Sequence, residues 1–107
     1  MKLPYRCTTA TGDTYDIEFP LHEATESPMR ASQILSAVLE AIDRDIAVCG
    51  ETANGDVLQA LAMAMAIRGG MVHAPQAVTD RLSQDLLSSA QSAMAEAGRS
   101  APPSGHA

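Results

Sequence analysis

Three histidines and two cysteines are the residues of this 107-residue chain whose types most often serve catalysis or metal binding. His22, His73 and His106 lie far apart, and none has a second His, Cys or carboxylate at the helical ligand spacing of a zinc motif such as H-E-x-x-H. Cys7 and Cys49 are too few and too widely separated for a secreted disulfide framework or a metal knuckle. The spacing therefore predicts no metal site and two reduced thiols.

Neither cysteine has the surroundings of a nucleophile. Cys49 falls near the C-terminal end of a predicted helix, where the helix dipole and the neighbouring Asp45 and Glu51 disfavour a thiolate. Cys7 is expected on the inward face of a strand with Leu3 and Tyr5, as a small core residue. A disulfide between the two stays open, because a sequence does not give the distance between them.

Glycines and serines also lack the context that chemistry requires. The stretch GETANGD spaces Gly50 and Gly55 like a phosphate-binding loop, but Asp56 stands where that motif has lysine. The serines near residue 90 lie inside a predicted helix and not on the sharp turn of a nucleophile elbow. We therefore expect no catalytic or cofactor-binding residues, and an enzyme is the less favoured interpretation.

Composition limits the class of protein and the choice of partners. A hydrophobic content of 46% with 19% charged residues is typical of one globular domain. A net charge of −6, with basic residues scattered singly, opposes nucleic-acid binding. The N-terminal residues contain no apolar run of signal-peptide length, which favours a cytoplasmic protein.

The first twenty residues have the two-residue period of β-strands. Apolar and polar residues alternate over residues 2–9 and 14–19, and the sequence ATGD between them supplies a glycine for a turn. This pattern predicts a β-hairpin with one apolar face. Because a two-stranded hairpin is marginal alone, a helix or another chain must cover that face.

Three helices are predicted after the hairpin. Ser27 and Pro28 favour a helix start, and Gly50 ends that helix. A second helix is expected from Asp56 to Arg68, capped by Asn54 or Asp56 and stopped by Gly69-Gly70, and a third from Pro75 to Gly98. The prediction is an α+β fold of order ββααα, with one domain over residues 1–98 and a disordered tail over 99–107.

The second predicted helix is apolar on all sides. Between Val57 and Ile67 only Gln59 is polar, over a length too short to cross a membrane, and Ala and Met favour a helix over a strand. A helix of this kind must be covered all round. Either the rest of the chain buries it as a core helix, or one side meets a second molecule.

The leading hypothesis is a small, acidic, non-enzymatic accessory or regulatory protein. It acts by protein–protein interaction with itself, as a homodimer, or with another protein, and its predicted interface comprises Leu58, Leu61, Ala62, Met65 and Ala66. The alternative is a small-molecule-binding or enzymatic domain whose pocket lies between hairpin and helices, lined by Tyr5, Tyr15, Cys49 and His73. A weaker third option is a mimic of acidic nucleic acid. No nucleic acid, membrane or cofactor is expected as a partner.

Overall fold

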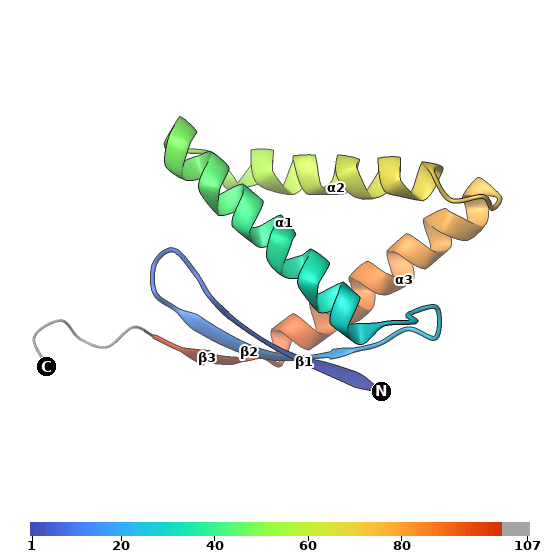
Figure 1. Ribbon diagram of the computed structural model, residues 1–107, viewed down its shortest axis with the longest axis horizontal. Coiled ribbons are helices and arrows are strands. Elements are labelled where there is room, and N and C mark those ends of the chain that lie inside the picture. The colour runs from blue at the N-terminus through green and yellow to red at the C-terminus, as the bar shows by residue number, and fades with distance from the viewer. Residues whose placement is uncertain (102–107) are drawn as a thin grey trace, which may run out of the picture. The chain divides into compact units, whose positions relative to one another are not determined.

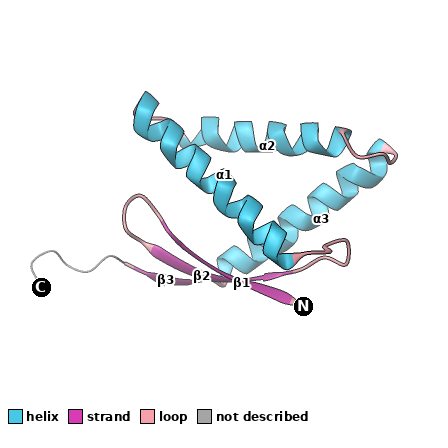
Figure 2. Cartoon of the chain, viewed as in Figure 1, coloured by secondary structure: helices cyan, strands magenta, loops and turns pink. Residues whose placement is uncertain are grey.

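The computed structural model describes residues 1–101 and shows a β-hairpin followed by three helices (Figure 1). This confirms the predicted α+β fold of order ββααα; a short third strand follows the helices (Figure 2). The elements are β1 (Lys2–Thr8), β2 (Thr14–Pro20), α1 (Pro28–Cys49), α2 (Asn54–Gly70), α3 (Gln76–Ala95) and β3 (Gly98–Ser100).

The chain divides into two compact units, each of which is described by itself. The sheet unit contains Met1–Leu35 and the residues from Ser88 onward, so it holds the strands, the start of α1 and the end of α3. The helical unit, Ser36–Leu87, holds the second half of α1, all of α2 and the first half of α3.

The hairpin follows the predicted alternation. Leu3 pairs with Phe19, Tyr5 with Ile17 and Cys7 with Tyr15, and these six side chains are half-buried or buried on one face of the sheet. Ile17 is the most buried of them. The opposite face carries exposed charges, among them the ion pair between Arg6 and Asp16.

The third strand corrects the predicted tail. Arg99 and Ser100, expected in a disordered segment, instead pair antiparallel with β2. The Arg99 guanidinium forms a 2.8 Å ion pair with Asp13 and lies 5.7 Å from the centre of the Tyr15 ring. These contacts hold β3 although it is only three residues long. The remainder of the predicted tail, with His106, lies beyond the described residues.

Helix α1 begins and ends as its sequence predicts. The Ser27 hydroxyl accepts a hydrogen bond from the backbone N–H of Arg30, and Pro28 occupies the first turn. Gly50 follows the last helical residue with a φ of +91°, and its N–H donates to the Ile46 carbonyl. A left-handed residue at this position closes the helix, and glycine adopts that conformation without steric cost.

The ends of α2 and α3 differ from prediction. Helix α2 starts at Asn54, after Ala53, with no side-chain cap, and continues through Gly69 and Gly70 to a right-handed Met71. Asn54 and Asp56 are therefore first-turn residues and not caps. Helix α3 begins directly after Pro75 and ends at Ala95, before Gly98, which opens β3 instead of ending the helix.

The single chain buries very little. Among the described residues, only Ile17, Ala93 and Thr79 are buried, and no side chain is completely buried. Helix α2 has no buried residue at all. The helical unit by itself therefore does not bury α2 as the core-helix interpretation requires.

Candidate functional site

The exposed surface of α2 contains the five residues that the sequence predicted as an interface. Leu58 is 66% exposed, Leu61 37% and Met65 36%, and Ala62 and Ala66 are exposed as well. Monomeric proteins rarely expose several large apolar side chains on one helix, and a contiguous apolar patch of this kind marks a binding surface. We call these five residues the α2 outer face.

A second side of α2 faces α1 across a groove within the helical unit. Successive residues of a helix turn by about 100°, so Ala60 and Ala62 point about 200° apart. Ala60, Ala64 and Val57 line a groove with α1, whereas Ala62 does not. Helix α2 therefore presents two apolar surfaces, one toward the groove and one away from it, with Leu61 bordering both.

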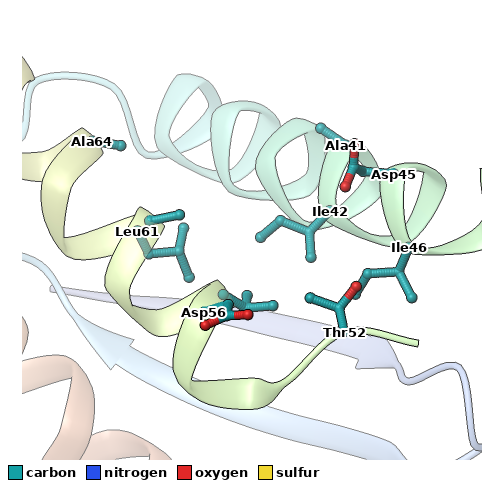
Figure 3. A pocket seen from close by; sticks show the side chains of 10 residues that line it. Ala41, Ile42, Asp45, Ile46, Thr52, Asp56, Leu61 and Ala64 are labelled. Carbon is teal, nitrogen blue, oxygen red and sulfur yellow. The ribbon is translucent and has the colours of Figure 1, made fainter. Parts of the chain in front are cut away.

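The groove is a cavity of about 370 Å³ between the second half of α1 and the first half of α2 (Figure 3). Ile42 from α1 and Leu61 from α2 point toward each other across it, and Thr52 lies at the end where the α1–α2 loop joins them (Figure 3). The lining residues are Ala41, Ile42, Asp45, Ile46, Thr52, Asp56, Val57, Ala60, Leu61 and Ala64. A volume of this size lies within the range of ligand pockets.

The polar groups of the groove are acidic and lie near its loop end. Asp45 is in the last turns of α1 and Asp56 in the first turn of α2, and both are exposed. Within residues 1–101, neither carboxylate has a Lys, Arg or His at ion-pair distance. The Thr52 hydroxyl is already used, because it donates to the Gly50 carbonyl at 3.0 Å.

A smaller cavity, of about 310 Å³, lies where α2 passes into α3. Ala66 and Gly69 line it from α2 and Thr79 from α3. The buried Thr79 hydroxyl donates to the Gln76 carbonyl at 3.0 Å, and a Cβ at Gly69 would lie 3.9 Å from that of Thr79. Gln76 and Asp80 of α3 also line this cavity, which has more polar lining than the α1–α2 groove.

The residues of the alternative ligand pocket fall in different units. Tyr5 and Tyr15 belong to the apolar face of the sheet unit, whereas Cys49 and His73 are exposed in the helical unit. None of the four lines either cavity described above. Cys49 makes one weak contact, in which its Sγ donates to the Asp45 carboxylate at 3.9 Å.

The free edge of β1 is poorly suited to strand pairing. The carbonyl of Met1 accepts from Leu21 and the N–H of Thr9 donates to Asp13, so the odd-numbered residues of β1 direct their backbone groups at β2. Even-numbered residues therefore face the open edge, and Pro4 among them has no N–H to offer. Proline and charged residues at an edge discourage association between sheets.

Residues 1–101 contain neither a metal-binding cluster nor a membrane-spanning helix. No three His, Cys, Asp or Glu side chains lie together as a metal ion requires, and none of the helices there combines the length and hydropathy of a membrane span. Comparison of the chain with protein-family models, with curated proteins and with solved structures finds no significant match.

The sequence singled out the α2 outer face but not the groove. Val57, Ala60, Leu61 and Ala64 follow the helical spacing i, i+3, i+4 and i+7, which is the signal that could have revealed a second side. That signal was hidden because every position around α2 is apolar, so no polar residue separates one side from the other.

Proposed function

We propose that the protein is a non-enzymatic interaction module that forms a homodimer through the α2 outer face. The observation that carries this proposal is that a helix apolar on all sides has no buried residue in the single chain. Exposed apolar area of this kind is removed from water when two copies associate, and an isologous pair is the commonest symmetry of soluble oligomers.

Charge also favours contact through the middle of α2. The chain carries a net charge of −6, so two copies repel each other wherever their acidic residues meet. Between Asp56 and Arg68, however, α2 has no charged residue. Two copies can therefore meet along this segment without bringing like charges together.

Multi-angle light scattering at micromolar concentration tests the proposal. The expected mass is twice the 11.2 kDa of one chain. Met65→Glu should lower that mass toward one copy and raise solubility, because it places a charge in the contact. A strictly monomeric wild-type mass, together with no gain in solubility for this variant, would refute the proposal.

A further inference from the structure

The α1–α2 groove lies on a different side of α2 from the proposed dimer contact and has the dimensions to receive a third helix. Two neighbouring helices form its walls, and the α2 wall runs from Asp56 to Ala64. At 1.5 Å per residue this wall is about 12 Å long, or two helical turns. Ala41, Ala60 and Ala64 are small lining residues, so the backbone of another helix can come close to the groove.

The apolar lining matches the recognition mode in which an amphipathic helix inserts its apolar side chains into a groove. Such a helix places anchors at i, i+3 or i+4 and i+7, which span the same two turns. Ile42 and Leu61, which point toward each other across the cavity in Figure 3, would contact a central anchor. A cavity of about 370 Å³ has room for several apolar side chains.

The negative charge of the groove favours a basic helix over a helix from a second copy of this chain. Its only ionisable residues are Asp45 and Asp56, and no cation of residues 1–101 pairs with either. Glu51, in the loop beside them, adds a third negative charge, and the whole chain has a net charge of −6. A second copy would bring the same negative charge to this end, whereas a basic helix would be attracted to it.

We propose that the α1–α2 groove binds an amphipathic helix of a basic partner protein. Its apolar side chains enter between Ile42 and Leu61, and a Lys or Arg lies at the loop end beside Asp45 and Asp56. On α2 this contact uses Val57, Ala60 and Ala64, which are not part of the dimer contact, and it shares Leu61 with that contact. The proposal does not rest on the dimer.

Calorimetric titration of the full chain with two synthetic helical peptides tests the proposal. Both peptides have about 14 residues, or four turns, with leucines on one side; the first carries lysines on its flanks and the second glutamates. The lysine peptide should bind at least tenfold more tightly. Its affinity should fall as salt is raised, because exposed charges are screened.

Three variants locate the binding. Ala60→Leu fills the groove without changing charge and should weaken binding of the lysine peptide at least tenfold. The matched variant Ala47→Leu, at an exposed position of α1 that does not line the groove, should leave the affinity within twofold. Asp45→Asn combined with Asp56→Asn should weaken it several-fold, as expected for two exposed ion pairs. Far-UV circular dichroism checks that each variant keeps its helices.

The outcomes separate this proposal from the dimer. Equal affinity for the two peptides, or no binding of either, would overturn the basic partner. Unchanged affinity in the Ala60→Leu variant would show that the peptide binds elsewhere on the acidic surface and would overturn the groove as the site. A monomeric mass with peptide binding that Ala60→Leu abolishes would refute the dimer alone and support the groove.

Discussion

Leu58→Ala is the most informative perturbation of the proposed dimer, because Leu58 is the most exposed large side chain of the α2 outer face. The substitution removes three carbons, worth about 2.4 kcal/mol at 0.8 kcal/mol each when they are fully buried. Since Leu58 is 66% exposed in one copy, about two thirds of that amount is still to be gained on association. The loss is about 1.6 kcal/mol per copy.

A symmetric dimer contains this change twice, so the cost is about 3 kcal/mol for the pair, which corresponds to a roughly 200-fold higher dissociation constant. Sedimentation equilibrium over a range of protein concentrations measures it directly. Val48→Ala is the matched control, because Val48 is 86% exposed but lies at the end of α1, away from the α2 outer face. It should leave the constant unchanged.

The reasoning fails in two cases that this assay distinguishes. If wild-type protein sediments as a single copy at every concentration, α2 is not a dimer contact. If Leu58→Ala and Val48→Ala shift the constant equally, the copies associate through general apolar contact and not through this face. Leu58→Ala should lower the free energy of unfolding of the monomer by only about 0.8 kcal/mol, because about one third of the side chain is protected there.

Two further predictions concern the sheet unit. The Arg6 guanidinium donates to the Asp16 carboxylate at 2.7 Å and holds the pKa of that carboxyl below its ordinary value of 3.8. The ion pair therefore stabilises the fold above pH 3.8, and this stabilisation is lost as the pH falls through the lowered pKa. The urea midpoints of wild type and Asp16→Asn should differ slightly at neutral pH, because the pair is exposed, and should converge in acid. A difference between the midpoints that widens in acid would contradict this prediction. Pro4→Val restores an N–H at the free edge of β1, so static light scattering should show more association, and unchanged scattering would show that the proline does not protect the edge.

The hairpin could be predicted because its information is local. Leu3, Tyr5 and Cys7 alternate with polar residues, and a glycine follows at the turn, so neighbours in sequence determine both strands and their inner face. The third strand could not be predicted in this way. Arg99 stands among Pro, Ser and Gly residues, and it is held by Asp13 and Tyr15, which are more than eighty residues away.

The end of α2 was also missed. Two adjacent glycines usually stop a helix, but α2 continues through Gly69 and Gly70 to Met71. A Cβ at Gly69 would make only an ordinary contact, 3.9 Å from that of Thr79, so packing does not explain the glycine. Ala60 and Ala64 were ambiguous in the sequence, because alanine favours a helix wherever it occurs and here also leaves the groove open.

The exposed apolar side chains of α2 connect the fold to the proposed interactions. Leu58, Met63 and Ile67 are each more than half exposed, so a partner that covers them would add apolar burial that one copy lacks. A partner that binds only the folded chain raises its stability in proportion to the logarithm of concentration. If a partner covers α2 as we propose, folding and association are coupled equilibria. The uncharged middle of α2 favours a second copy there, and its acidic groove end favours a basic helix.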